Sequence, residues 1–314
     1  MPKVALKTRI KAWWEGYPTS VEGTATPRRA GPHRSAQAFG RSCPYGPLAD
    51  TLGLLFGQGH HRPGGTEFLF RMIGEHVPLQ EQNAMVLGCG MGGMCRDLAE
   101  RFDLRVEGLD ENRELLRCGM EMIRDTMRGK TVSLAPINLK DMEFGAARYQ
   151  LVVAQEILHA QADRHDIYER IERILRRTGR MVFTQLVAND DADRDALSLA
   201  LCTALEPEQR TYLTQEEERR CLVETGLEVL VEEYVTDEVL KHTIAVFADW
   251  QRAVETMASF IEQPRMLQEL VRIVDHWQRR TDAMKSGNLR VVLFHAAKRT
   301  SELRANSAPT ISTA

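Results

Sequence analysis

Three glycines that follow a short apolar run carry the clearest chemical signal in the sequence. Gly88, Gly90 and Gly93 have GxGxxG spacing, directly after the apolar segment Asn83–Leu87. Glycine lets a backbone approach a ligand closely and tolerates positive φ. Free N–H groups at the start of the following helix attract anionic groups. The spacing therefore predicts a ligand-binding turn, in preference to a turn that serves only tight packing of helix on sheet.

An acidic residue stands where a nucleotide cofactor needs a hydrogen-bond acceptor. Asp110 lies 20 residues after Gly90 and ends the expected second strand, 104–109. A carboxylate in that place can accept both hydroxyl protons of an adenosine ribose. The strand, the glycines and Asp110 together predict an adenosine cofactor, and both NAD and S-adenosylmethionine fit this geometry.

Strands and helices must alternate along the chain to position this turn. Apolar runs predict strands at 83–87, 104–109, 131–137, 149–154, 180–186, 227–234 and 289–296. Helical spacing of apolar residues predicts helices at 94–102, 111–127, 166–175 and 213–225. Such alternation predicts a mostly parallel sheet with helices on both faces, which binds ligands at the carboxyl ends of its strands.

Two longer helical patterns stand before the last expected strand. Apolar residues recur every three or four positions in 240–261 and 267–284, with Pro264 between the stripes and Gly287 after them. We expect residues 236–287 to form a helical cap over the carboxyl ends of the strands. Its outer face is expected to carry Lys241, Glu255, Glu269, Arg279 and Arg280. The stripes then point inward, or into a second copy of the chain in a homodimer.

The expected domain division has four parts: an N-terminal arm at 1–65, the sheet domain at 66–235 and 288–299, the cap at 236–287, and a disordered tail at 300–314. Basic residues dominate the first 40 positions, which is typical of a transit peptide or a nucleic-acid arm. The large aromatic residues Trp13, Trp14 and Tyr17 favour an arm that packs on the domain instead.

Composition excludes several classes of protein. The balance of 41 basic against 44 acidic residues gives a net charge of −3, which argues against a dedicated nucleic-acid binder. No apolar run reaches the roughly 18 residues that cross a bilayer. The six cysteines are scattered without a CxxC pair, so we expect a reduced, cytoplasmic protein with no metal site.

The motifs resemble those of class I S-adenosylmethionine-dependent methyltransferases over roughly residues 54–298. VLGCGMGG and VEGLDEN are similar to the first two motifs of that family, and YQLVVAQEILHA and LRRTGRMVFTQL to its fourth and fifth strands. The cap and the upstream FGQGHHRPGG resemble the small-molecule methyltransferases of the sarcosine/dimethylglycine and phosphoethanolamine groups. Val86, Asn138 and Gln185 depart from acidic residues that are common in the family.

The resemblance implies a Rossmann-like α/β fold with a doubly wound, seven-stranded, mostly parallel sheet, a helical cap inserted before the last strand, and an N-terminal extension. The cofactor-binding residues that it implies are Gly88, Cys89, Gly90, Met91, Asp110, Glu111, Asn138, Leu139 and Gln155. Residues 88–91 would line the methionine and ribose of S-adenosylmethionine. Asp110 would bind the ribose hydroxyls, and Glu111, Asn138 and Leu139 would surround the adenine.

The reacting end of the site follows the fourth strand. Gln155 would face the methyl sulfonium, where proximity and orientation supply much of the rate. His159 is the expected general base for an acceptor that must lose a proton, and Glu156 and Tyr45 are second choices. A histidine at a helix start can equally satisfy a backbone group. His60 and His61 could close over the site or face solvent, and we favour the solvent-facing interpretation.

The expected substrate contacts are Gln155, His159, Phe247 and Trp250, and the cap aromatics could hold a cation over their rings. We expect a methyl group to move to the nitrogen or sulfur of a small metabolite, such as a precursor of glycine betaine or dimethylsulfoniopropionate. Three alternatives remain open. They are an O- or C-methyltransferase that uses His159 as base, an NAD-dependent oxidoreductase, and a non-catalytic partner protein that binds the cofactor.

Overall fold

The computed structural model of the 314-residue chain describes residues 45–74, 82–124, 131–139, 145–160, 163–256 and 264–299, without the side chains of 249–256 and 264. The expected N-terminal arm before residue 45 and the tail after residue 299 therefore lie outside the described residues. Within the described part of the chain, no helix is long and apolar enough to cross a membrane.

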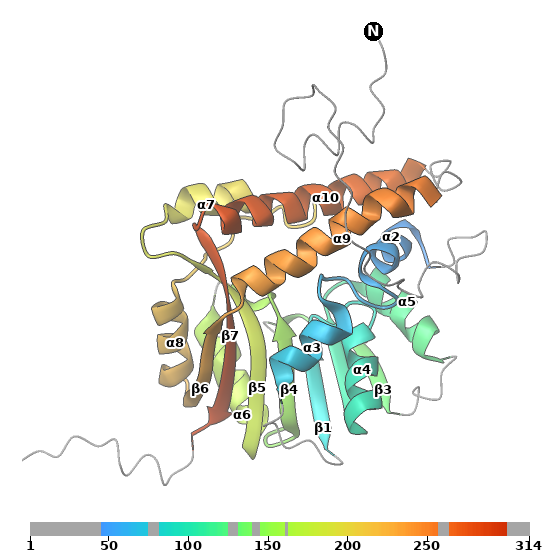
Figure 1. The fold of residues 1–314 in the computed structure, drawn as a ribbon. Coiled ribbons are helices and arrows are strands. Elements are labelled where there is room, and N and C mark those ends of the chain that lie inside the picture. The colour runs from blue at the N-terminus through green and yellow to red at the C-terminus, as the bar shows by residue number, and fades with distance from the viewer. Residues whose placement is uncertain are drawn as a thin grey trace, which may run out of the picture.

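One sheet of seven strands organises the molecule (Figure 1). In chain order the strands are β1 (Asn83–Leu87), β2 (Arg105–Asp110), β3 (Val132–Pro136), β4 (Tyr149–Gln155), β5 (Leu175–Ala188), β6 (Leu227–Tyr234) and β7 (Leu289–Lys298). Their order across the sheet is β3-β2-β1-β4-β5-β7-β6, and only β7 runs antiparallel to its neighbours. The predicted doubly wound, mostly parallel, seven-stranded sheet is confirmed.

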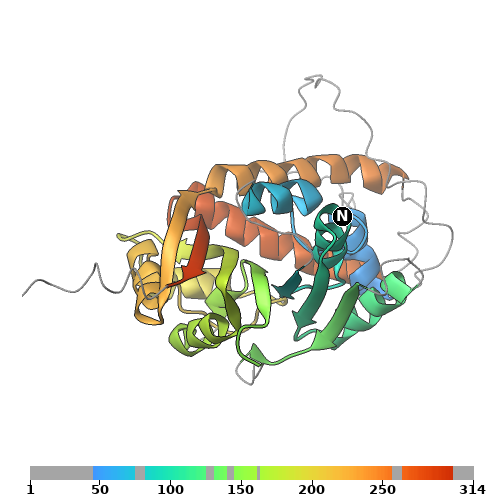
Figure 2. The same ribbon diagram turned by 90° about the horizontal axis from the view of Figure 1, so that it is seen from below.

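Helices cover both faces of the sheet (Figure 2). They are α3 (Gly65–Ile73), α4 (Gly93–Phe102) and α5 (Arg113–Arg124) on one face, and α6 (Arg164–Ile174) and α8 (Gln215–Glu224) on the other. Strand β1 shows why both faces are covered. Ala84 and Val86 pack into an apolar core under α3, α4 and α5, and Met85 and Leu87 pack into a second core under α6 and α8. Successive side chains of a strand point to opposite faces, so an apolar run is buried on both sides.

A third apolar core lies at the carboxyl edge of the sheet. It joins α2 (Pro47–Phe56) and α5 to the long helices α9 (Thr236–Thr256) and α10 (Pro264–Lys285), which cross that edge in Figure 1. Helix α7 (Arg194–Leu201) lies against α10 as well. The sequence interpretation missed α2, α3 and α7. For α2, Pro47 at the first turn and Asp50 just after it are the start signals that went unused.

One expectation about the cap is wrong. Arg280 is predicted to lie on the outer, charged face of the second cap helix, but its side chain is only 2% exposed. Its carboxylate partners, described below, explain how a charge can lie there. Ile244, which belongs to the apolar stripe of α9, is 40% exposed, so the stripe does not point inward at this position.

Candidate active site

The glycine turn is held in place by Asp110. The N–H groups of Gly88 and Cys89 donate to the Leu109 carbonyl at 2.8 and 3.1 Å. Gly90 N–H donates to Asp110 Oδ2 at 2.7 Å, and Asn112 N–H donates to Oδ1 at 2.8 Å. Gly88 and Gly90 have φ values of +67° and +54°, a region that favours glycine. Burial raises the pKa of the Asp110 carboxyl, and these N–H groups and Arg62 oppose that rise.

A cavity of about 320 Å³ opens between this turn and the cap. At its β2 end it is lined by the predicted residues Gly88, Asp110, Glu111 and Leu139, together with the apolar residues Leu109, Leu115 and Ile137. The carboxylate can accept hydrogen bonds from ribose hydroxyls, and the apolar residues beside it can pack against a flat ring. This end of the cavity therefore fits an adenosine group.

Other residues predicted to bind the cofactor do not line this cavity. Cys89 and Met91 are 1% exposed and pack into the protein behind the turn. Asn138 is exposed at the end of the β3 loop. Gly90 turns its Cα toward a histidine, since a Cβ built on it would lie 2.5 Å from His61 Nδ1.

The loop at 57–64 carries His61 and Arg62 to the cavity wall. Gly93 N–H donates to the Gly59 carbonyl at 2.9 Å, and a Cβ on Gly93 would lie 2.6 Å from that oxygen, so only glycine permits this close approach. His60 Nε2 lies 3.1 Å from Asp97 Oδ2, to which Thr66 Oγ1 donates at 2.5 Å. These contacts fasten the loop to the first turns of α3 and α4.

The expectation that His60 and His61 face solvent is wrong. His60 is buried against Asp97, and His61 lines the cavity. Burial lowers the pKa of His61 to about 3, with Arg62 and His60 adding to the effect. His61 is therefore a neutral imidazole at physiological pH.

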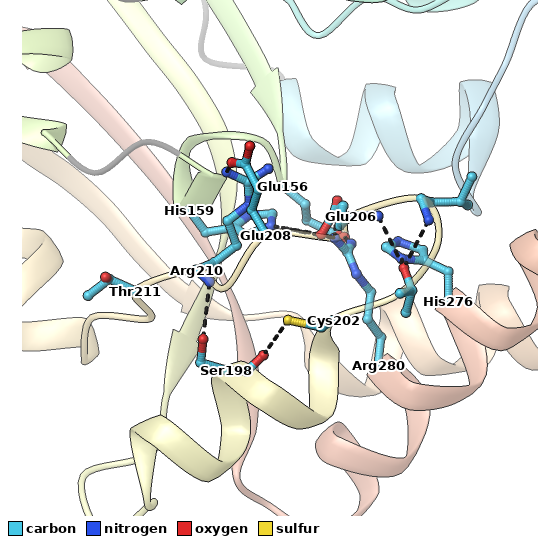
Figure 3. A network of polar contacts seen from close by, with 12 residues as sticks. Glu156, His159, Ser198, Cys202, Glu206, Glu208, Arg210, Thr211, His276 and Arg280 are labelled. Atoms are coloured by element: carbon cyan, nitrogen blue, oxygen red, sulfur yellow. Dashed lines mark hydrogen bonds and ion pairs between the residues drawn. The ribbon is translucent and has the colours of Figure 1, made fainter.

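A network of charged side chains forms the far end of the cavity (Figure 3). Arg280 reaches down from α10, and its Nη1 lies 3.0 Å from Glu156 Oε2. Its Nη2 lies 2.9 and 3.1 Å from the two carboxylate oxygens of Glu206. His159 Nε2 is 3.5 Å from Arg280 Nη2 and 3.6 Å from Glu206 Oε2. Glu156, which follows β4 with φ +50°, brings the sheet edge into contact with the cap.

The network fixes the protonation of its members. Burial works to raise the pKa of Glu206, but Arg280 and His159 outweigh it and hold that pKa well below its usual range. The two carboxylates in turn raise the pKa of Arg280 against the effect of burial. Burial lowers the pKa of His159 to about 4 although Glu206 opposes it, and lowers that of His276 as well. The site thus holds neutral histidines among paired charges.

Two of the three predicted catalytic residues line the cavity, His159 and Glu156. His159 is stacked on Tyr212, and its buried Nδ1 has no hydrogen-bond partner among the described residues. Tyr45 does not line the cavity, and its carbonyl accepts from Cys118 Sγ at 2.9 Å.

The other predicted substrate contacts lie away from the cavity or beyond what is described. Gln155 is buried at the end of β4 and does not line the cavity. Phe247 packs into the core of the cap. The side chain of Trp250 lies outside the described residues. The cap aromatic that does line the cavity is Trp277, with the Arg280 guanidinium 5.3 Å from its ring centre.

Sequence reasoning missed several residues of the site: Arg62, Glu206, His276, Trp277 and Arg280. Arg62 stands inside the FGQGHHRPGG segment, whose resemblance to a cofactor approach was a usable signal. The others gave no local signal. Among the described residues, no group of three or more His, Cys, Asp or Glu side chains could hold a metal ion.

Comparisons with known proteins show which class of enzyme this chain resembles. Residues 84–179, from β1 into β5, match the family model of the methyltransferase domain. The predicted kinship with S-adenosylmethionine-dependent small-molecule methyltransferases is confirmed for that region. A curated relative is the glycine/sarcosine/dimethylglycine N-methyltransferase of Actinopolyspora halophila, 27% identical over 135 residues. That match spans 40% of this chain and 22% of the relative.

Solved structures share the fold. The phosphoethanolamine N-methyltransferase 2 of Haemonchus contortus superposes with a TM-score of 0.70 at 18% identity, over 80% of this chain and 57% of that one. A sarcosine dimethylglycine methyltransferase structure from Galdieria sulphuraria gives 0.62 at 18% identity, over 74% and 85%. A [4+2]-cyclase also gives 0.62, at 14% identity over 81% and 93%. The fold by itself therefore does not decide the reaction.

Proposed function

We propose that this protein is an S-adenosylmethionine-dependent methyltransferase that acts on a small molecule. The observation that carries the proposal is the cavity shared by Asp110 and the glycine turn at one end and by Glu156 and His159 at the other. When bound, S-adenosylmethionine supplies a methyl group already activated by its sulfonium. The chain has to bind the adenosine group, exclude water and orient the acceptor.

One end of the cavity binds the cofactor in this proposal, and the other end binds the acceptor. Asp110 accepts hydrogen bonds from the ribose hydroxyls, and Glu111 and Leu139 flank the adenine. At the other end Trp277 and the neutral histidines shape an acceptor site that is closed by α2 and α10. Phosphoethanolamine N-methyltransferase 2, which has a similar fold, was crystallised with S-adenosyl-L-methionine.

A binding experiment tests this proposal against an NAD-dependent enzyme. S-adenosylhomocysteine should raise the melting temperature of the protein and bind in calorimetry, and NAD should do neither. Protection by NAD without protection by S-adenosylhomocysteine would defeat the assignment. Cofactor binding without turnover on any acceptor would instead support a non-catalytic partner protein.

The acceptor atom that we propose is the nitrogen or sulfur of a small metabolite, such as an osmolyte precursor. The cavity is small, and the curated relative methylates glycine, sarcosine and dimethylglycine according to its name. A panel of amines and thioethers incubated with methyl-labelled S-adenosylmethionine tests this. The label should appear in an amine or a sulfonium product, and label found only in ethers or on carbon would contradict the proposal.

A second candidate is methyl transfer to an oxygen or carbon with His159 as general base. It is favoured by the position of His159 on the cavity wall, as a neutral imidazole whose Nδ1 is unpartnered among the described residues. Such a base takes the acceptor proton while the acceptor attacks the methyl carbon. His159→Gln should then lower kcat far more than it changes the affinity for S-adenosylhomocysteine. An unchanged kcat would remove His159 from this role.

A further inference from the structure

Arg62 is a largely buried cation in the cavity wall, and it has only one distant carboxylate partner among the described residues. Its side chain is 13% exposed, and its Nη1 lies 3.6 Å from Glu156 Oε2. The same carboxylate oxygen is only 3.0 Å from Arg280 Nη1, so Arg62 shares an acceptor that Arg280 holds more closely. The buried Nε of Arg62 has no hydrogen-bond partner among the described residues.

Glu206, the other carboxylate of the network, does not pair with Arg62 in place of Glu156. Both oxygens of Glu206 contact Arg280 Nη2, at 2.9 and 3.1 Å. Arg280 therefore engages both carboxylates of the network, and within the described part of the chain Arg62 has one long ion-pair contact. A buried charge is costly unless it is paired and hydrogen-bonded. The guanidinium of Arg62 can therefore donate hydrogen bonds to an anionic group of a ligand.

The neighbouring groups select the kind of anion. His61, beside Arg62, and His159 are neutral because burial lowers their pKa values, so they add no further positive charge. The Glu156 carboxylate lies close to the guanidinium of Arg62. A phosphate dianion would be repelled by Glu156, whereas a carboxylate carries a single charge. Its two oxygens also match the planar fork of an arginine.

We propose that Arg62 is the carboxylate-binding residue of this cavity. Its guanidinium donates two hydrogen bonds to the carboxylate of a bound amino acid-like group. That group comes either from the methionine end of the cofactor or from the acceptor substrate. The assignment of the carboxylate to the cofactor or to the acceptor rests on the proposed function. The assignment of Arg62 as a carboxylate-binding residue rests on its own contacts.

The first arm of the test compares two ligands that differ only in the carboxylate. S-adenosylhomocysteine and its decarboxylated form, S-adenosyl-3-thiopropylamine, are titrated calorimetrically into the wild type, Arg62→Gln and Arg62→Lys. The matched control is Arg71→Gln, because Arg71 is 38% exposed and pairs with Glu233 on the surface. If the cofactor supplies the carboxylate, Arg62→Gln weakens S-adenosylhomocysteine by at least about tenfold. The decarboxylated ligand should bind Arg62→Gln as tightly as it binds the wild type, which also shows that the variant is folded.

The second arm asks whether the substrate supplies the carboxylate. With S-adenosylhomocysteine saturating, sodium acetate is added to each protein, and sodium chloride at equal ionic strength is the control. A substrate carboxylate site predicts that acetate raises the melting temperature of the wild type and of Arg71→Gln but not that of Arg62→Gln. S-adenosylhomocysteine then binds Arg62→Gln as it binds the wild type. Arg62→Lys should be intermediate in whichever arm responds, because it keeps the charge and loses the fork.

The outcomes separate this inference from the proposed function. If S-adenosylhomocysteine binds the wild type, but Arg62→Gln changes neither its affinity nor the effect of acetate, the carboxylate site is overturned and the methyltransferase proposal stands. An equal loss of affinity for both cofactor forms would also overturn it, because Arg62 would then act through the fold of the loop. If no adenosine ligand binds the wild type, the proposed function fails, and stabilisation by acetate that depends on Arg62 would still support the carboxylate site.

Discussion

Asp110 holds the glycine turn and also lines the cavity. Its two oxygens accept the N–H groups of Gly90 and Asn112, and the residue is part of the cavity wall. The backbone turn and the proposed ribose contact therefore depend on the same group. Gly90 next to it has positive φ and a histidine ring where a Cβ would stand.

Asp110→Ala should weaken binding of S-adenosylhomocysteine by about 1–3 kcal/mol, because the ribose hydroxyls lose their acceptor and the turn loses a restraint. Calorimetry measures the change. Glu121→Ala is the control, since Glu121 forms a surface pair with Arg117 on α5 and should leave affinity unchanged. Equal affinity of the Asp110 variant and the wild type would remove Asp110 from the cofactor site.

Gly90→Ala should greatly reduce cofactor binding. The added Cβ would lie 2.5 Å from His61 Nδ1 at a φ of +54°, so the His61 ring must move away from the turn and the backbone of the turn is strained. Gly53→Ala is the matched control, because a Cβ at Gly53 has no atom within 4 Å and its φ is helical. Calorimetry and circular dichroism should show a folded variant with weak binding. Normal affinity would mean that the turn tolerates displacement of the His61 ring.

At the scale of elements, a buried arginine joins the long cap helix α10 to the carboxyl edge of the sheet, in addition to the apolar contacts of the helix. Arg279 and Arg280 are adjacent on this helix, but their side chains are 44% and 2% exposed. Arg279 pairs with Asp275 on the same helix. Arg280 joins α10 to Glu156 at the end of β4 and to Glu206 in the loop after α7.

Arg280→Met should destabilise the protein by roughly 3–5 kcal/mol, because it leaves the buried carboxylate of Glu156 and the partly buried carboxylate of Glu206 without their shared cation. Arg279→Gln on the neighbouring position should cost less than about 1 kcal/mol, as expected of an exposed pair. Urea unfolding followed by circular dichroism measures both. Similar losses for the two variants would show that the buried network does not anchor the cap.

For the whole molecule, the charged network makes stability depend on pH. His61, His159 and His276 lie at the cavity, and burial lowers the pKa of each. An unfolded histidine takes up a proton near pH 6.5. The folded protein cannot accept that proton at His159 until the pH nears about 4. Acidification below about 6.5 therefore favours the unfolded chain, and this stability is fully present only above that pH.

Unfolding free energy should accordingly fall between pH 7.5 and pH 5, with His159 alone contributing about 2 kcal/mol of the loss. Urea titrations at the two pH values measure it. His159→Asn should reduce the difference between the two pH values. His165→Asn should leave it unchanged, because the side chain of His165 is 46% exposed. A pH difference that is the same in all three proteins would contradict a neutral, buried His159.

The sequence by itself determined the sheet, the glycine turn and the place of Asp110. These are local features: an apolar run buried on both faces, glycines that allow positive φ, and an acid at the next strand end are each visible within about thirty residues. The ends of the strands moved by only a few positions, except that β5 begins at Leu175, where it pairs with Tyr149.

Only the tertiary structure decided which charged side chains meet at the far end of the cavity. Arg62, Glu156, Glu206 and Arg280 are dispersed over more than two hundred positions of the chain, and folding brings them together. Periodicity assigns a charged helix residue to solvent, because an unpaired charge is too costly to bury. Arg280 escapes that rule because carboxylates from two other elements meet it there. No pattern along α10 records those partners, since the energy that buries the arginine comes from residues outside the helix.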